Sequence, residues 1–236
     1  KEYGHHINDF FKEENDRLEN FSISWSNFYL DFSKNRFSNN TFKLLTNLCE
    51  ETNLKNNIDQ YFNGAIINET ESRAVLHTAL RSSGNDVVDK TLNKIINMSD
   101  EINNAKRLGY SGKKITDVVN IGIGGSHLGP EMVTEALAYY SKGVKPHFIS
   151  NIDPDFTSKL LKDLNPETTL FIIVSKTFTT IETLENANKV RAWFIDNASE
   201  IAIKDHFIAI SNNTEAPKKF GVSLDNILSI PDWVGG

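Results

Sequence analysis

Two stretches of the chain combine a strand-like apolar run with a loop whose residues can donate hydrogen bonds to an anion. Residues 118–121 run into the loop 122–126, and residues 170–174 run into the loop 175–180. A helix-like pattern follows each loop. The N–H groups that open a helix lie at the positive end of its dipole and bind anions. Two such loops in one sheet predict a phosphorylated ligand held between them.

The second loop is rich in donors. Its six residues carry four hydroxyls and one ammonium, which suit a phosphate dianion because that group accepts several charge-assisted hydrogen bonds. The alternative is helix capping, because Thr179 and Glu182 fit a capping box. Capping leaves the first three residues of the loop unexplained, so the pattern favours anion binding.

The first loop has two other interpretations. A dinucleotide fingerprint would need a third glycine at position 127, which is His127, and an acidic residue about 20 positions on, whereas Asp153 comes only after the second strand. Alternatively, the glycines only permit a tight turn from strand to helix. We expect His127 to be a neutral surface group, and no histidine spacing indicates a metal site.

The elements that must position these loops begin near residue 115. Continuous apolar strands alternate with helical runs, which predicts an α/β fold with a doubly wound parallel sheet covered on both faces. In the flavodoxin-like strand order 2-1-3-4-5, both loops open onto one crevice at the switch point. We expect strands near residues 117–122, 145–150, 169–175, 205–210 and 226–230, and helices near 131–140, 156–164, 181–194 and 215–220.

Residues 1–109 predict a mainly helical N-terminal region, and residues 110–236 predict the α/β domain. Within the first region we expect helices near residues 42–54, 74–80 and 91–108.

Composition limits the classes of function. A net charge of −6 argues against a nucleic-acid surface. Cys49 is the only cysteine, which excludes an internal disulfide and indicates a reducing compartment. The sequence lacks a run of about 18 apolar residues and a signal-peptide pattern, so we expect no membrane span and a cytoplasmic protein. The chain stops on Asp-Trp-Val-Gly-Gly at 232–236, and we expect it to be part of something longer.

Several segments together resemble the phosphoglucose isomerase family over nearly the whole chain. They are Phe-Tyr-Leu-Asp-Phe-Ser-Lys-Asn at 28–35, Asn-Glu-Thr-Glu-Ser-Arg-Ala-Val-Leu-His-Thr-Ala-Leu-Arg at 68–81, the loops 122–130 and 175–183, and residues 232–236. The resemblance implies the first of two sugar isomerase (SIS) domains. It implies interconversion of glucose 6-phosphate and fructose 6-phosphate through a cis-enediol, in glycolysis and gluconeogenesis. It also implies a cytoplasmic homodimer that needs no metal or organic cofactor.

The resemblance also assigns the substrate-binding residues, with Phe178 contributing through its backbone: Gly125, Ser126, Ser175, Lys176, Thr177, Phe178, Thr179 and Thr180. Ile181 departs from the glutamine that is frequent in the family. No catalytic residue is expected within the chain, because the family's enediolate-stabilising Arg follows Gly236, and its base Glu, its ring-opening His (from the partner subunit) and its C-terminal Lys come later. We therefore expect these 236 residues alone to be inactive. Two other classes stay open, a non-catalytic sugar-phosphate sensor and a nucleotide-binding oxidoreductase domain.

Overall fold

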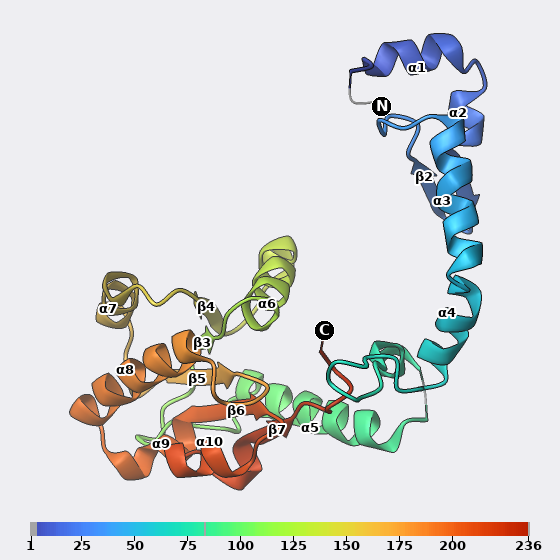
Figure 1. Ribbon diagram of the computed structural model, residues 1–236. Coiled ribbons are helices and arrows are strands. Elements are labelled where there is room, and N and C mark those ends of the chain that lie inside the picture. The colour runs from blue at the N-terminus through green and yellow to red at the C-terminus, as the bar shows by residue number, and fades with distance from the viewer. Residues whose placement is uncertain (1–3, 83, 236) are drawn as a thin grey trace. The chain divides into compact units, whose positions relative to one another are not determined.

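The computed structural model describes residues 4–82 and 84–235 (Figure 1). It divides the chain into two compact units, Lys1–Ala74 and Val75–Gly236, which are described separately below. The change of sequence pattern near residue 110 lies within the second unit. The division at residues 109 and 110 therefore stays a prediction about sequence organisation.

The second unit is built on a five-stranded sheet with the order β4-β3-β5-β6-β7, in which all neighbouring strands are parallel. In chain order this is 2-1-3-4-5, so the predicted doubly wound topology is confirmed. The strands are β3 (Asp117–Ile121), β4 (Lys145–Ile149), β5 (Thr169–Val174), β6 (Phe207–Ser211) and β7 (Ile227–Ser229).

Helices precede and connect these strands. The α-helices are α5 (Asp86–Asn103), α6 (Gly125–Ala136), α7 (Pro154–Lys162), α8 (Ile181–Asn197), α9 (Ile203–His206) and α10 (Glu215–Phe220). Short 3-10 helices lie at η1 (His77–Arg81), η2 (Ala138–Tyr140), η3 (Glu200–Ala202) and η4 (Leu224–Asn226). The helix expected at 74–80 is thus a 3-10 turn displaced toward its C-terminal end.

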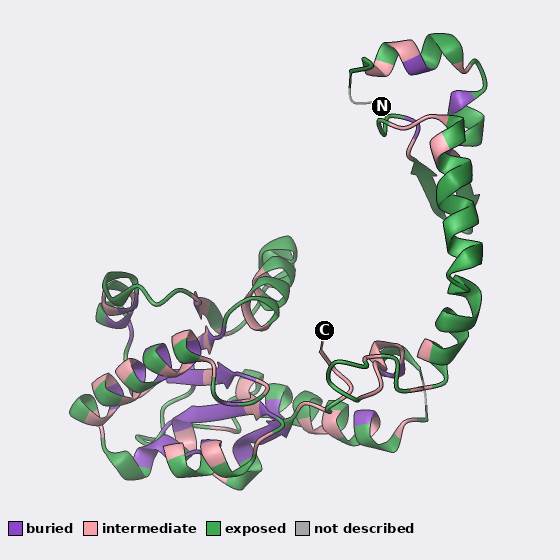
Figure 2. Ribbon diagram, viewed as in Figure 1, coloured by how far each residue is buried: buried purple, intermediate pink, exposed green. Residues whose placement is uncertain are grey.

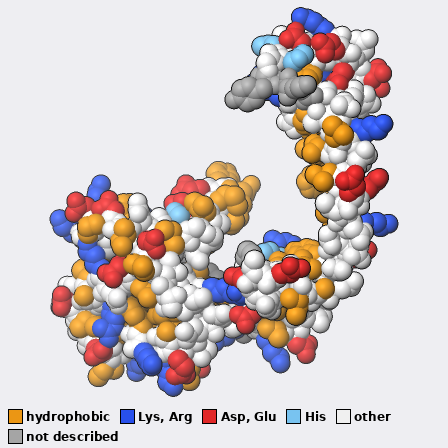
Figure 3. Space-filling model, in the orientation of Figure 1, with side chains coloured by type: hydrophobic (Ala, Val, Ile, Leu, Met, Phe, Trp, Pro, Cys, Tyr) orange, Lys and Arg blue, Asp and Glu red, His pale blue; other side chains and the backbone are white. Residues whose placement is uncertain are grey.

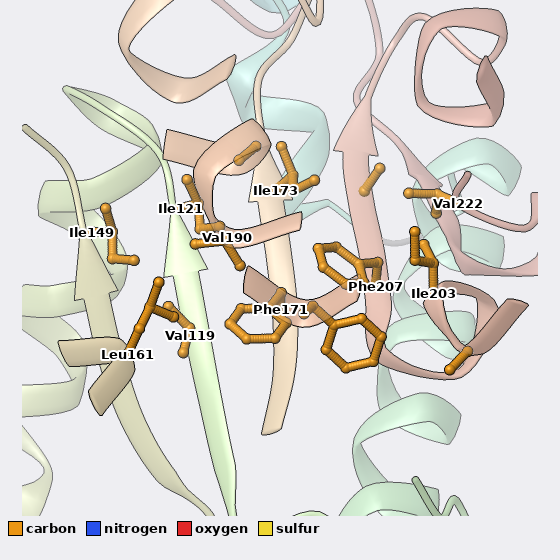
Figure 4. Close-up of a cluster of buried hydrophobic side chains, with 14 of the residues drawn as sticks. Val119, Ile121, Ile149, Leu161, Phe171, Ile173, Val190, Ile203, Phe207 and Val222 are labelled. Atoms are coloured by element: carbon orange, nitrogen blue, oxygen red, sulfur yellow. The ribbon is translucent and has the colours of Figure 1, made fainter. Parts of the chain in front are cut away.

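Both faces of the sheet are apolar because alternate residues of each strand point to opposite sides. On one face Val119, Phe171 and Phe207 pack with Val190 and Phe194 of α8 in the larger core (Figure 4). On the other face a smaller cluster joins Met98 of α5 to residues in or just before the strands, namely Ile115, Leu170, Ile208 and Leu228. Strands β5 and β6 are accordingly buried along most of their length (Figure 2).

The first unit contains α1 (Ile7–Glu13), α2 (Arg17–Asn20), β1 (Ser22–Trp25), β2 (Phe28–Asp31), α3 (Asn39–Glu51) and α4 (Leu54–Phe62). Strands β1 and β2 pair antiparallel, and this hairpin was absent from the helical pattern predicted for the region. No residue of α3 or α4 is buried. Trp25 and Phe28 stack on the exposed hairpin with ring centroids 5.2 Å apart, and apolar side chains show on the surface of this unit (Figure 3).

A buried arginine organises the centre of the first unit. The Arg17 side chain is fully buried, and it donates to the carbonyl oxygens of Ser33 and Asn35, each at 2.6 Å. Asp31 holds the same turn by accepting from the Ser33 N–H and hydroxyl, at 2.9 and 2.6 Å. These bonds and Lys34 lower the pKa of Asp31 to about 2. The Leu-Asp-Phe-Ser-Lys-Asn segment is therefore a carbonyl-presenting turn that binds a guanidinium.

Within the described ranges, no helix has both the length and the apolar content needed to cross a membrane.

Candidate functional site

The first loop is a tight turn that requires glycine at two positions. Strand β3 ends at Ile121 and α6 begins at Gly125. A Cβ on Gly122 would lie 2.8 Å from the Ser126 Cβ and from its carbonyl oxygen. Gly124 has φ +59° and ψ −123°, a conformation that L-residues adopt only at a cost. The interpretation of these two glycines as structural is therefore correct, and it leaves Gly125 for a different role.

A side chain of β3 completes the first turn of α6. Position 130 is a proline inside the helix, so it has no N–H to donate to the Ser126 carbonyl four residues earlier. The Asn120 Nδ2 donates to that carbonyl instead, at 3.0 Å. Asn120 thus supplies the bond that Pro130 cannot make, and it fixes the start of α6 against the sheet.

The first loop leaves hydrogen-bond donors open. Among the described residues, the N–H groups of Gly124 and Gly125 and the Ser126 hydroxyl have no partner. A Cβ on Gly125 would have no atom within 4 Å, so the space over the start of α6 is open. Open amides beside open space at a helix N-terminus are the arrangement that binds anions.

The second loop is held by its own side chains. Ser175 is buried, and its hydroxyl accepts from the Phe178 N–H at 3.1 Å and lies 3.2 Å from the Thr180 hydroxyl. Phe178 adopts a left-handed φ of +57°, and its buried ring packs on Phe220 with centroids 6.0 Å apart. Packing of this ring compensates for the backbone strain that a non-glycine residue carries there.

The capping box that Thr179 and Glu182 offered as an alternative to anion binding does not form. Helix α8 begins after Thr180, and no side chain caps it. The Thr179 hydroxyl instead lies 2.6 Å from the Thr177 hydroxyl, and both residues are exposed. Because no side chain caps this 17-residue helix, the N–H groups of Thr179, Thr180 and Ile181 have no acceptor within the described part of the chain.

The Lys176 side chain is bound to the turn at residues 232–235. Its ammonium donates to the carbonyl oxygen of Asp232 at 2.8 Å and to that of Val234. Its own carbonyl accepts from the Asn212 N–H at 2.8 Å and from the Ser211 hydroxyl at 2.9 Å. The carbonyl and the side chain of Lys176 are therefore both bound to other parts of the second unit.

Strand pairing brings the two loops to one edge of the sheet. Ile121 pairs with Ile173 at the ends of β3 and β5. Because these strands are parallel neighbours, the loops that follow them leave the same edge side by side. All eight predicted site residues, Gly125, Ser126, Ser175, Lys176, Thr177, Phe178, Thr179 and Thr180, lie in these loops or at the first residues of α6.

The structure corrects the expectation for His127. Its side chain is only 13% exposed and its Nε2 lies 3.1 Å from a carboxylate oxygen of Glu131. Its ring packs edge-on to Phe148 with centroids 5.8 Å apart. His127 is therefore a packing residue of α6 rather than a surface group, because β4 lies against the first turn of that helix.

Two features of the site escaped sequence reasoning. The Asn120 bond could have been suspected from Pro130, since an unpaired carbonyl always follows from a proline inside a helix. The contact of the 232–235 turn with Lys176 had no local signal, because it joins residues 56 and 58 positions apart. In the described parts of the chain, no group of three His, Cys, Asp or Glu side chains could hold a metal ion.

Comparison with known proteins identifies the family. The family model described as phosphoglucose isomerase matches residues 31–236. A protein of Christiangramia forsetii named glucose-6-phosphate isomerase is 49% identical over 98% of this chain and 45% of its own length. One of Buchnera aphidicola with the same name is 46% identical over 98% of this chain and 44% of its own length.

A solved structure shares both fold and sequence. The crystal structure of a glucose-6-phosphate isomerase from Chlamydia trachomatis is 26% identical with a TM-score of 0.75, and the match covers 98% of this chain and 46% of that one. The chain thus spans about half the length of the relatives it matches. The resemblance first seen in the loops and in the segments at 28–35 and 68–81 is confirmed along almost the entire sequence, and the chain belongs to the phosphoglucose isomerase family.

Proposed function

We propose that the loops 122–126 and 175–180 together bind the phosphate of a sugar phosphate, and that the protein to which these residues belong interconverts glucose 6-phosphate and fructose 6-phosphate. The observation that carries the proposal is the set of unpaired N–H groups at the starts of α6 and α8, beside each other at the ends of β3 and β5. The relatives named glucose-6-phosphate isomerase support the choice of substrate.

The residues of the two loops divide into donors and supports. The N–H groups of Thr179, Thr180 and Ile181 and the hydroxyls of Thr177 and Thr179 are the donors to a phosphate dianion. The helix dipole of α8 adds a favourable field at the same point. Ser175 and Phe178 act as supports, since their side chains are buried within the loop fold.

The first loop borders the sugar. Gly125 leaves open space where any other residue would place a Cβ, and the Ser126 hydroxyl lies on the first turn of α6. We propose that the sugar hydroxyls occupy this space, with the Gly124 and Gly125 N–H groups as further donors.

Gly125→Ala tests this placement, with Gly129→Ala as the matched control on the same helix. Neither added methyl meets an atom of the protein within 4 Å, so both variants fold. We expect Gly125→Ala to weaken fructose 6-phosphate binding by roughly 5- to 30-fold, because a methyl in an occupied space costs about 1–2 kcal/mol. Isothermal titration calorimetry of the two variants measures the effect, and equal affinities would place the sugar elsewhere.

Thr177→Val with Thr179→Val tests the donors. Charge-assisted hydrogen bonds contribute roughly 1.5–3 kcal/mol each, so we expect loss of fructose 6-phosphate binding by more than about tenfold. Fructose without phosphate should bind neither form detectably. Tight binding of NADH together with no binding of fructose 6-phosphate would favour the nucleotide-binding alternative.

We further propose that residues 1–236 alone bind the sugar phosphate without turning it over. The resemblance assigns the enediolate-stabilising Arg and the base Glu to positions after residue 236, and each such group contributes orders of magnitude in rate. A coupled isomerase assay on the purified chain measures this. Turnover would show that a catalytic base lies within these residues. The homodimer implied by the resemblance stays a prediction.

A further inference from the structure

The 232–235 turn is bound to the candidate phosphate loop by a single ammonium. Lys176 donates from Nζ to the carbonyl oxygens of Asp232 and Val234. A lysine ammonium has three donors and carbonyl oxygens are good acceptors for it, so two of the three donors are already used within the protein. By its charge, Lys176 would be the first residue assigned to the phosphate, but its ammonium is bound to the turn.

Other contacts show that the turn has a defined position in the second unit. The Gly235 N–H donates to the His77 Nε2 at 3.0 Å, and the Leu76 N–H donates to the Trp233 carbonyl at 3.2 Å. Asn212, whose N–H bonds the Lys176 carbonyl, also donates from its side chain to Asp232 Oδ1 at 2.8 Å. The turn is thus held from two sides, by η1 and by the end of β6.

The Lys176 ammonium lies close to the backbone of the turn at Gly235. Its φ of +148° is one that L-residues rarely adopt, and a Cβ there would lie 2.9 Å from the Lys176 Nζ. Glycine at this position lets the turn fold around the ammonium. The contact therefore depends on glycine at position 235 as well as on the Lys176 side chain.

We infer that the Lys176 side chain is a positioning group, which couples the phosphate loop to the 232–235 turn, and that its ammonium is not a ligand of the phosphate. The inference rests on the proposed function only for its ligand-dependent part. A dianion that fixes the loop also fixes the Lys176 backbone, and through its side chain the turn. Since coupling between two sites is reciprocal, loosening the turn should loosen the loop slightly.

Fluorine NMR of the 236-residue chain labelled with 5-fluorotryptophan tests the coupling. The chain has three tryptophans, and Trp233 lies in the turn, so its resonance is assigned by Trp233→Phe. Trp193, which packs on Phe171 with centroids 6.1 Å apart, serves as the internal reporter of an intact sheet. Fructose 6-phosphate is the ligand, and its affinity is measured in parallel by calorimetry.

The variants separate tethering from direct binding. Lys176→Met removes the ammonium, and Lys176→Arg restores a cation that can reach the carbonyls. Lys189→Met is the matched control, because Lys189 on α8 also donates its ammonium to a backbone carbonyl, that of Pro154.

We expect Lys176→Met to shift or broaden the Trp233 resonance without ligand, with Trp193 unchanged, while Lys176→Arg and Lys189→Met resemble the parent chain. Fructose 6-phosphate should move the Trp233 resonance in the parent and not in Lys176→Met. Its affinity should fall less than about fivefold, whereas a lost direct contact would cost roughly 10- to 150-fold.

An unchanged Trp233 resonance in ligand-free Lys176→Met would overturn the inference, and so would a loss of affinity beyond tenfold in Lys176→Met, whatever the resonance does, because the ammonium would then bind the phosphate directly. If the parent chain does not bind fructose 6-phosphate at all, the proposed function fails, but the ligand-free spectra still decide whether Lys176 holds the turn.

Discussion

The bond from Asn120 to the Ser126 carbonyl makes a sharp prediction about how a proline is accommodated in α6. The Nδ2 of Asn120 donates to this carbonyl at 3.0 Å, and the residue that would normally donate to it is Pro130. Asn120→Ala leaves the carbonyl without a donor. Since Gly122 lies against this carbonyl, water replaces the bond only partly. We expect a loss of unfolding free energy of about 1–2 kcal/mol.

Pro130→Ala should rescue the loss because alanine restores the backbone N–H at that position. In the Pro130→Ala background, we expect Asn120→Ala to cost less than about 0.5 kcal/mol, which gives a coupling energy of about 1 kcal/mol. The effect of proline on the unfolded chain is present in both arms of the cycle and cancels. The coupling therefore reports on the shared acceptor alone.

Urea unfolding of the four proteins, followed by circular dichroism, measures the cycle. Hydrogen exchange of the α6 amides gives a local reading that does not depend on the first unit. Equal costs of Asn120→Ala in both backgrounds would refute the reasoning, since the two residues would then not serve one carbonyl.

Two further predictions concern buried basic side chains. The fully buried His206 accepts from the Tyr110 N–H at Nε2, and burial lowers its pKa from the usual 6.5. Below about pH 6.5 the His206 imidazole is protonated in the unfolded chain but resists protonation in the folded chain. The free energy of unfolding should therefore fall with pH in this range, by up to about 1.4 kcal/mol per pH unit. Urea unfolding between about pH 5 and pH 7.5 measures this slope. Arg17→Lys should destabilise the first unit by about 2 kcal/mol, because an ammonium cannot replace a planar guanidinium that bonds both the Ser33 and Asn35 carbonyls; hydrogen exchange of the first unit measures it.

Each of these predictions has a matched control. His206→Gln removes the titrating group, so the slope with pH should become shallower; an unchanged slope would assign it to other residues. Arg36 also donates to a backbone carbonyl, that of His5, but from an exposed position. Arg36→Lys should therefore change little, and a loss equal to that of Arg17→Lys would mean that burial is not what makes Arg17 important.

The sheet was predictable because its signals are local and repeated. Five continuous apolar runs separated by helical patterns admit few topologies, and the expected strand order is the observed one. The strand bounds differ from the expected ones by one or two residues. Helix α10 was expected at 215–220 and has those bounds.

The start of α6 was not predictable from local signals. Pro130 is typical of a first helical turn, so the helix was expected near residue 131, whereas it begins at Gly125. The early start is possible because Asn120 satisfies the carbonyl that the proline leaves open. A tertiary bond from the neighbouring strand overrides the proline signal here.

The site was only partly predictable for the same reason. The loops and their place at one edge follow from the strand order, but the distribution of hydrogen bonds within them does not. The capping box looked plausible because Thr179 and Glu182 have the right spacing, yet the Thr179 hydroxyl lies against that of Thr177. The commitment of Lys176 to the 232–235 turn depends on a contact across the fold. The β1–β2 hairpin was missed because its strands are four residues long and mostly exposed.

A crystal structure with fructose 6-phosphate bound tests the central claim most directly. The account predicts that the phosphorus lies between the first turns of α6 and α8, within hydrogen-bond reach of the N–H groups of Thr179 to Ile181. The chain also has a groove lined by other cations, Lys90, Lys94 and Arg107 among them. A phosphate in that groove, with the two loops empty, would contradict the account.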